Sequence, residues 1–170
     1  DPNGKTDAIF TIKNLNGDGK DVDNPWIHAL LNETMHGQHK ALVITPQAGW
    51  FQYWNGYNTG DQWNQPNYTT ENTPAETDNE KLVIGILKDV CKNYRVNPKR
   101  IYLTGCSMGG WGTWDLYARY PHTFAAAIPI SGGGNLTAAG TTLAKKPVWA
   151  FHGARDNLIT PNHSTTLIDA

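Results

Sequence analysis

The sequence predicts an α/β fold, built on a mostly parallel sheet with helices on both faces. From residue 41 onward, short apolar runs alternate with segments whose apolar residues recur at a helical period. A serine flanked by glycines stands where one of these apolar runs gives way to a helical segment. Strands joined by helices are parallel, because the helix returns the chain to the end of the sheet from which it started.

The first half of the chain is expected to supply two strands, a helix and a long loop. Residues 8–13 alternate between apolar and polar side chains, as a strand does. An Asn-Pro pair opens a helix over 25–36, whose apolar residues share one face. The apolar run 41–46 is expected to form a buried strand. Residues 47–78 show no periodicity and are rich in aromatics, Asn and Thr, so they are expected to form a loop.

The second half predicts a regular alternation of helices and strands. Thr77 and Glu80 form a capping box, which starts a helix that continues to about Tyr94. The strands expected after it are 100–105, 124–130 and 147–153. The helices expected are 108–119, 137–143 and a last one that begins at Thr160-Pro161.

Composition and charge exclude several classes of protein. The 170 residues fit one domain, and 14 basic against 15 acidic residues argue against nucleic-acid and membrane-surface partners. No apolar run reaches the ~18 residues of a membrane span. Seven Trp, sixteen Asn and eighteen Thr are typical of secreted proteins that act on sugars or plant polymers, so secretion is expected. The start at Asp1 indicates a mature or trimmed product.

Two cysteines, Cys91 and Cys106, are the only ones in the chain. They are expected at opposite ends of the sheet, roughly 15–20 Å apart at ~3.3 Å per strand residue. A disulfide needs Cα atoms within ~7 Å, so we expect two buried free thiols. The His, Asp and Glu spacings indicate no metal site, and no cofactor is expected.

Residues 105–109 read Gly-Cys-Ser-Met-Gly, a G-x-S-x-G motif between an expected strand and an expected helix. The small residues allow a strained turn that lifts the Ser107 hydroxyl above the sheet. There the Met108 N–H, at the positive end of the helix, points toward a developing oxyanion. Gly110 and Gly112 let the helix pack closely. The alternative is a glycine-rich phosphate loop, but no Lys or GKS/T follows.

A serine nucleophile needs a base and an acid that orients this base. Asp156 follows the last expected strand and lies at the same edge of the sheet as Ser107, which predicts a catalytic carboxylate. The alternative role is a turn-forming Asp beside Asn157. His152 is expected to be a structural hydrogen-bonding residue. His163 lies seven residues after Asp156, in the expected first turn of the last helix, where a capping or solvent-facing role is the alternative to that of the base.

Seven of the eighteen aromatic residues lie in the nineteen residues 50–68. A loop that follows the carboxyl end of a strand reaches the edge where open α/β sheets bind ligands. Trp50, Trp54 and Trp63 are therefore candidates for binding sugar rings or phenolic acids. A loop that anchors itself with aromatic residues is the other interpretation, and the sequence leaves both open.

The stretches 100–133 and 147–161 resemble the α/β-hydrolases. The most similar branch contains the secreted esterases, among them polyhydroxyalkanoate depolymerases and feruloyl and acetylxylan esterases. The resemblance implies Ser107 as nucleophile, Asp156 as triad acid and the Met108 N–H as one oxyanion donor. It also implies a further donor before the first helix, where this chain offers the Leu15 N–H in place of the usual HGxG turn.

The same resemblance places the catalytic His about 30 residues after the acid, which is beyond residue 170. The chain is therefore expected to be a single partial α/β-hydrolase domain over 1–170, incomplete at one or both ends, with the aromatic-rich loop at 47–78.

Together these features predict a serine carboxylic-ester hydrolase that acts through an acyl-enzyme. Its expected substrate is an ester linked to a polymer or a carbohydrate, such as a plant cell-wall polysaccharide or a polyester. Two alternatives remain open. The first is a serine peptidase of the prolyl-oligopeptidase type, which shares the same turn. The second is a non-catalytic carbohydrate-binding relic of the fold.

Overall fold

The structure, a computed structural model, describes residues 6–12, 41–48, 53–54 and 73–170. The expected helix over 25–36, the turn that contains Leu15 and most of the loop 47–78 lie outside the described residues.

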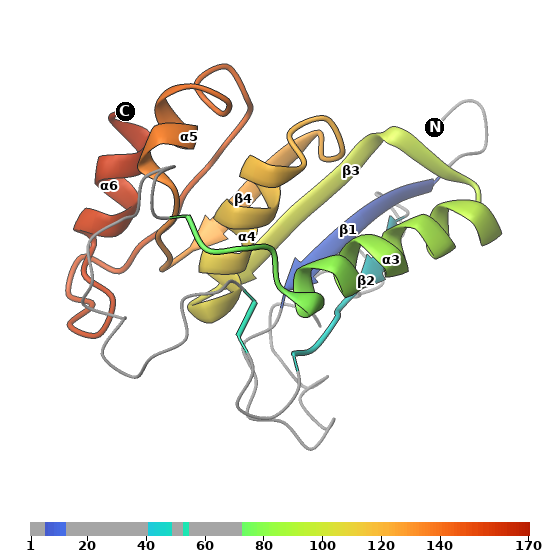
Figure 1. Cartoon of the computed structure of the whole chain (residues 1–170), viewed down its shortest axis with the longest axis horizontal. Helices are drawn as coiled ribbons and strands as arrows, with labels where there is room; N and C mark the ends of the chain where they lie inside the picture. The colour runs from blue at the N-terminus through green and yellow to red at the C-terminus, as the bar shows by residue number, and fades with distance from the viewer. Residues whose placement is uncertain (1–5, 13–40, 49–52, 55–72) are drawn as a thin grey trace.

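A four-stranded parallel sheet forms the centre of the described chain, with the strand order β2-β1-β3-β4 (Figure 1). Its strands are β1 (Thr6–Ile12), β2 (Ala41–Ile44), β3 (Val96–Cys106) and β4 (Ala126–Ile130). In the register, Ile9 lies beside Val43 on one side and beside Tyr102 on the other, and Thr104 lies beside Ile128. The predicted parallel sheet is therefore confirmed.

The third strand begins earlier than expected. β3 starts at Val96 instead of residue 100, and it runs through Pro98. The pairing with β1 shifts register between Thr6 and Ala8, so this early part is joined to the rest by an irregularity. Proline is tolerated in strands at such irregular positions, where its missing N–H disrupts no regular ladder.

The expected strand over 147–153 is present as an edge segment with two isolated bridges. It pairs in parallel with β4 through Ala127 with Val148 and through Ile130 with Phe151. The Trp149 N–H donates to the Ala127 carbonyl at 3.0 Å. The segment thus extends the sheet beyond β4, although no continuous strand is formed.

Four helices accompany the sheet: α3 (Asp78–Asn93), α4 (Met108–Arg119), α5 (Leu136–Gly140) and α6 (Asn162–Ile168). The capping box of α3 is confirmed, because the Thr77 side chain accepts from the Glu80 N–H and the Glu80 carboxylate accepts from the Thr77 N–H. α5 starts one residue earlier than expected, where the Asn135 side chain caps it, and it ends at Gly140.

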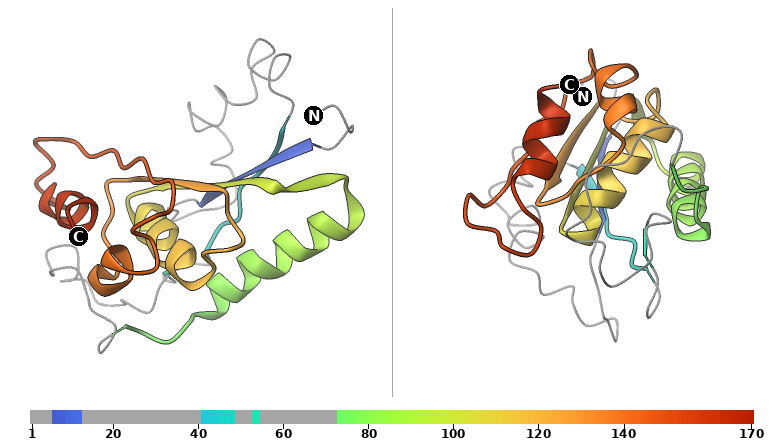
Figure 2. Two further views of the ribbon diagram at one scale, coloured as in Figure 1. Left: turned by 90° about the horizontal axis from the view of Figure 1, so that it is seen from above. Right: turned by 60° about the vertical axis from the view of Figure 1, so that its left-hand side comes forward.

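α3 and α4 lie on the same face of the sheet (Figure 2). The core between them and the sheet contains fully buried apolar side chains, among them Leu103, Leu116, Tyr117 and Val83. In the edge segment, Val148 and Ala150 pack against this core. No helix among the described residues is long and apolar enough to cross a membrane.

The two cysteines are free, as expected, but they are not both buried. Cys91 is exposed and Cys106 is half-buried. The prediction of a buried Cys91 was wrong because α3 buries only one stripe of its surface, formed by Val83, Ile84 and Leu87 near its start. Cys91 follows Leu87 by about one turn on the same face, but this last turn of the helix is exposed.

Candidate active site

Ser107 occupies a strained turn between β3 and α4. Its backbone has φ 56° and ψ −120°, in a region that residues with a Cβ rarely adopt. The Ser107 N–H donates to the Ile130 carbonyl at 2.9 Å, and the Ser107 carbonyl accepts from the Trp111 N–H at 3.1 Å. The Ser107 side chain makes no capping bond to the helix. Backbone bonds therefore hold the strained conformation, and the hydroxyl is not used to cap α4.

Two glycines allow the first turn of α4 to approach the chain after β4. A Cβ on Gly110 would lie 2.4 Å from the Ile130 carbonyl oxygen, and one on Gly132 would lie 2.4 Å from the Gly110 carbonyl carbon. Real side chains do not tolerate such contacts, so only glycine fits at either position. The close packing expected at Gly110 is confirmed.

Gly112, two residues further along α4, allows Trp54 to approach the helix, because a Cβ at this position would lie 2.7 Å from the Cβ of Trp54. Trp54 is fully buried at this contact. A ring without exposed surface offers nothing to a ligand, so the structure assigns Trp54 to the core and corrects its expected role as a substrate-binding residue. Trp50 and Trp63 lie outside the described residues, and their role stays a prediction.

Met108 is the first residue of α4. The first N–H groups of a helix have no partner within the helix, and the helix dipole makes this end positive. The Met108 N–H is thus of the right kind for an oxyanion donor, and its catalytic role stays a prediction.

Asp156 lies in the turn that follows the edge segment. Its Oδ1 accepts from the Leu158 and Ile159 N–H groups, both at 3.0 Å, and its Oδ2 lies 3.5 Å from His152 Nε2. The Ile159 and Leu158 N–H groups, with smaller effects from His152 and the Ser131 hydroxyl, hold the pKa of the carboxyl below its usual range. Asp156 is therefore ionised at neutral pH.

The turn-forming role that the sequence left open for Asp156 is present, since Oδ1 holds this turn together. The carboxylate also lies near the end of β3. Burial raises the pKa of the Cys106 thiol, and the negative charge of Asp156 raises it further. The structure thus brings Asp156 to the edge of the sheet that carries Ser107.

Ser131 is a member of this site that sequence reasoning missed. It follows β4, has φ 47°, and hydrogen-bonds through its side chain to Asp156. Its N–H donates to the Phe151 carbonyl at 2.8 Å, so it also joins β4 to the edge segment. The run Ser-Gly-Gly-Gly directly after an apolar strand was the available signal for an unusual backbone at this point.

Two histidines lie close to Asp156 in the sequence, and each has contacts within the fold. His152 makes hydrogen bonds with both ring nitrogens, Nδ1 with Ser164 Oγ and Nε2 with the Ile159 carbonyl, each at 2.7 Å. Its expected structural role is confirmed. His163 lies in the first turn of α6, as expected, and is buried edge-on against Trp111, with ring centroids 5.2 Å apart.

No group of three or more His, Cys, Asp or Glu side chains in the described part of the chain could hold a metal ion. The candidate site contains Ser107, Ser131 and Asp156, and it lies at the carboxyl ends of β3, β4 and the edge segment.

A family model of known proteins, described as the dienelactone hydrolase family, matches residues 53–170. The chain belongs to the dienelactone hydrolase family. The matched range contains Ser107, Ser131 and Asp156, and it covers both stretches that resemble the α/β-hydrolases, 100–133 and 147–161.

Two curated relatives of the chain are named as a depolymerase and as an acetylxylan esterase/xylanase. It is 36% identical over 96 residues to poly(3-hydroxyalkanoate) depolymerase C of Paucimonas lemoignei, a match that covers 56% of this chain and 21% of the relative. It is 31% identical over 83 residues to a bifunctional acetylxylan esterase/xylanase of Neocallimastix patriciarum, which covers 49% of this chain and 12% of the relative. The chain thus spans about a fifth or less of these relatives.

Solved structures of α/β-hydrolase esterases have the same fold. A thermostable esterase is 28% identical with a TM-score of 0.84, over 99% of this chain and 44% of that one. An acetyl xylan esterase from Aspergillus awamori is 16% identical with a TM-score of 0.64, over 96% of this chain and 67% of that one. The predicted α/β-hydrolase fold is therefore confirmed.

Proposed function

We propose that the protein is a serine carboxylic-ester hydrolase that acts through an acyl-enzyme. The observation that carries this proposal is the backbone of Ser107, which is held at φ 56° between the end of β3 and the start of α4. Such strain persists where the surroundings impose it, and it gathers at functional sites. Membership of a hydrolase family and the esterases among the structural neighbours support the same reaction class.

In this mechanism the Ser107 Oγ attacks the acyl carbon of the ester while a histidine takes the serine proton. The Met108 N–H stabilises the oxyanion of the tetrahedral intermediate. The same histidine then donates the proton to the leaving alcohol, and the acyl-enzyme remains. Water, activated by that histidine, attacks the acyl-enzyme and releases the acid and free Ser107.

Asp156 orients this histidine and stabilises it when it is protonated. The hydrogen bonds that keep Asp156 ionised suit that role, because an ionised carboxylate is the form that stabilises an imidazolium. Both ring nitrogens of His152 are hydrogen-bonded to Ser164 and to the Ile159 carbonyl, and His163 is buried against Trp111, so we place the base outside the described residues.

The substrate class proposed is an ester linked to a polymer or a carbohydrate. The names of the two curated relatives, a polyhydroxyalkanoate depolymerase and an acetylxylan esterase/xylanase, support it. Secretion is part of the same proposal and rests on the composition, which is rich in Trp, Asn and Thr.

Covalent labelling tests the proposal directly. A fluorophosphonate probe should modify wild-type protein at Ser107, as mapped by mass spectrometry, and should leave the other positive-φ serine, Ser131, unmodified. Ser107→Ala should abolish the labelling together with the hydrolysis of p-nitrophenyl acetate and methyl ferulate. Labelling or ester hydrolysis that survives in Ser107→Ala would refute the assignment. Cleavage of peptide amides at comparable rates would instead favour a peptidase.

A further inference from the structure

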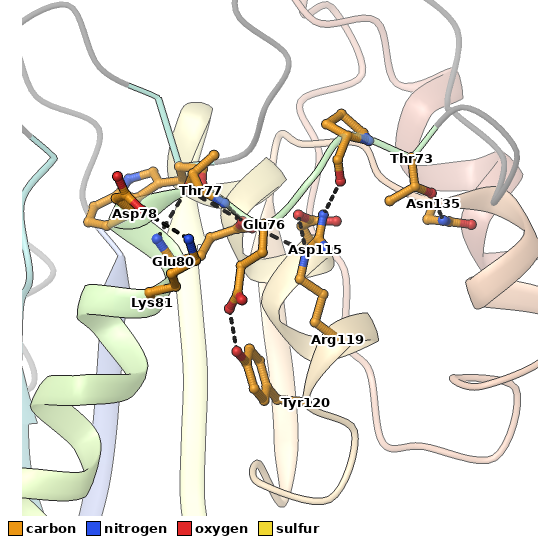
Figure 3. Close-up of polar contacts among 12 residues, drawn as sticks. Thr73, Glu76, Thr77, Asp78, Glu80, Lys81, Asp115, Arg119, Tyr120 and Asn135 are labelled. Carbon is orange, nitrogen blue, oxygen red and sulfur yellow. Dashed lines mark hydrogen bonds and ion pairs between the residues drawn. The ribbon is translucent and has the colours of Figure 1, made fainter.

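A buried charged cluster joins α3 to α4, away from Ser107. It consists of Glu80 in the first turn of α3 and of Asp115 and Arg119 in the second half of α4 (Figure 3). Glu80 and Asp115 are 0% and 1% exposed. Arg119 Nε lies 2.9 Å from Asp115 Oδ2 and 3.7 Å from Glu80 Oε2. Two carboxyl groups therefore share one guanidinium in the protein interior.

One of these two carboxyl groups is neutral. Burial, together with the hydrogen bond to Asp115 and its charge, raises the pKa of Glu80 to about 9. Glu80 Oε2 accepts from the Thr77 N–H at 2.9 Å, whereas the buried Oε1 accepts no hydrogen bond from the described residues. The hydrogen bond to Asp115 therefore holds the proton between the two carboxyl groups.

The cluster holds the segment 73–77, which we call the strap, by its backbone. Arg119 Nη2 donates to the Pro74 carbonyl at 2.6 Å, and Glu80 accepts from the Thr77 N–H. Two further side-chain bonds fix the strap, from Tyr120 to Glu76 and from Asn135 to Thr73. Figure 1 shows the strap, in green, passing over α4 before it enters α3.

The strap in turn holds Trp54. The Thr77 hydroxyl donates to the Trp54 carbonyl at 2.5 Å, and Asn79 Nδ2 donates to the Tyr53 carbonyl at 2.9 Å. The Trp54 ring rests on Gly112, which lies about 7.5 Å along α4 from Ser107 at ~1.5 Å per residue. Contacts thus run from the helix of Ser107 through Trp54, the strap and the cluster back to the same helix.

The hydrogen bonds of the cluster fix the backbone conformation of the strap, and stability alone does not explain them. Replacing a buried ion pair by apolar residues is often neutral for stability or favourable, so stability alone does not require such a cluster. Its donors and acceptors are directed at backbone groups of the strap, where hydrogen bonds specify one conformation. In sequence, residues 53–54 and the strap flank the stretch 55–72.

We propose that Glu80, Asp115 and Arg119 are positioning residues of the Ser107 site, which fix Trp54 and the strap against α4 and so hold in place the helix that begins at Ser107. The part of this inference that concerns Ser107 rests on the proposed esterase function. The anchoring part, that the cluster fixes the strap, is independent of it.

The variants for the test separate the charge cluster from the general stability of the fold. Glu80→Gln reproduces the neutral carboxyl, with an acceptor and a donor, and should keep the strap exchange and the kinetic constants of wild type. Glu80→Ala removes the hydrogen bonds of this side chain to the Thr77 N–H and to Asp115. Arg119→Lys keeps the charge but loses the planar fork that reaches Asp115 and Pro74 together, and it serves where Glu80→Ala fails to fold. Lys81→Gln is the matched control, since Lys81 is exposed and pairs with Asp78 in the same helix turn.

The first measurement is amide hydrogen exchange in the protein without substrate. In Glu80→Ala and Arg119→Lys the Thr77 amide and its neighbours in the strap should exchange about tenfold faster, as expected for the loss of one hydrogen bond. The amides of Leu103 and Leu116 should stay protected. Strap exchange that is unchanged in both variants would overturn the anchoring.

The second measurement compares KM and kcat for methyl ferulate and p-nitrophenyl acetate. Both variants should lower kcat/KM for both esters roughly tenfold while the core amides stay protected, because the helix that begins at Ser107 loses its contacts with the strap and Trp54. Unchanged kcat/KM in both variants, or a fall that comes with faster exchange of the core amides, would overturn the positioning. If wild type hydrolyses neither ester, the esterase proposal fails and the positioning of Ser107 fails with it, while the exchange result still decides the anchoring.

Discussion

The neutral Glu80 makes a definite prediction about how stability depends on pH. A carboxyl with a pKa near 4.5 in the unfolded chain and about 9 in the folded chain binds a proton only when folded throughout this window. The free energy of unfolding therefore falls as pH rises from about 4.5 to about 9, with a limiting slope of about 1.4 kcal/mol per pH unit. Glu80→Gln carries no titrating group, so it should gain stability relative to wild type over the same window.

The other charged groups around Glu80 do not reproduce this effect. Asp115 and Arg119 face it from α4, and Glu76 and Tyr120 lie beyond them. The hydrogen bond to Glu76, with burial and nearby negative charge, raises the pKa of Tyr120 to about 12, so this tyrosine stays neutral. Wild type and Glu80→Gln share all four groups, so the contributions of these groups to the pH dependence cancel when the stabilities of the two proteins are subtracted.

Urea unfolding of both proteins at pH 5, 7 and 9 measures that difference. The stability of Glu80→Gln minus that of wild type should grow by several kcal/mol between pH 5 and pH 9, within the limit of about 1.4 kcal/mol per unit. A difference in stability that stays constant across the three pH values would show that Glu80 is ionised in the folded protein, and the assignment of a neutral carboxyl group would be wrong.

Three further predictions concern the site itself. Gly110→Ala should destabilise the fold by about 1–3 kcal/mol and abolish fluorophosphonate labelling, since its methyl would lie 2.4 Å from the Ile130 carbonyl oxygen. The control Gly85→Ala, whose methyl would have nothing within 4 Å, should stabilise the fold by about 0.5–1 kcal/mol. Thermal unfolding compares the two variants. Asp156→Asn should lower kcat by about 10³–10⁴-fold. The pKa of Asp156 is lower in the folded chain, so its ionised form stabilises the fold at neutral pH, and this stability is lost as pH falls through the folded pKa. The free energy of unfolding of Asp156→Asn should therefore fall less steeply in acid than that of wild type, and equal slopes would contradict this. Ser107→Gly should be inactive yet more stable by about 1 kcal/mol, because glycine adopts φ 56° without strain, and a destabilised variant in calorimetry would argue against stored strain.

The elements whose patterns are local were predictable from the sequence. The capping box at Thr77 located the start of α3, and the glycine-flanked Ser107 located the turn between β3 and α4. Both depend on residues within a few positions of one another. The early start of β3 was missed because Pro98 usually breaks a strand, and its irregular pairing with β1 is a property of two distant segments.

The errors at the site have the same origin. Trp54 was assigned to a binding surface by its aromatic neighbours in sequence, but its burial is decided by Gly112, 58 positions later. Ser131 was missed because its bond to Asp156 joins the chain after β4 to the turn after the edge segment. The roles of Trp50 and Trp63 stay predictions. Contacts between distant segments are set by the fold, which a local pattern does not contain.

The contact between Gly110 and Gly132 has a consequence for how the site fails on heating. Backbone touches backbone there, so no flexible side chain lies between the helix that carries Ser107 and the chain that leads from Ser131 to Asp156. The proposed nucleophile and acid are therefore parts of one rigid body. Loss of labelling on heating should coincide with global unfolding, with no earlier transition confined to the site.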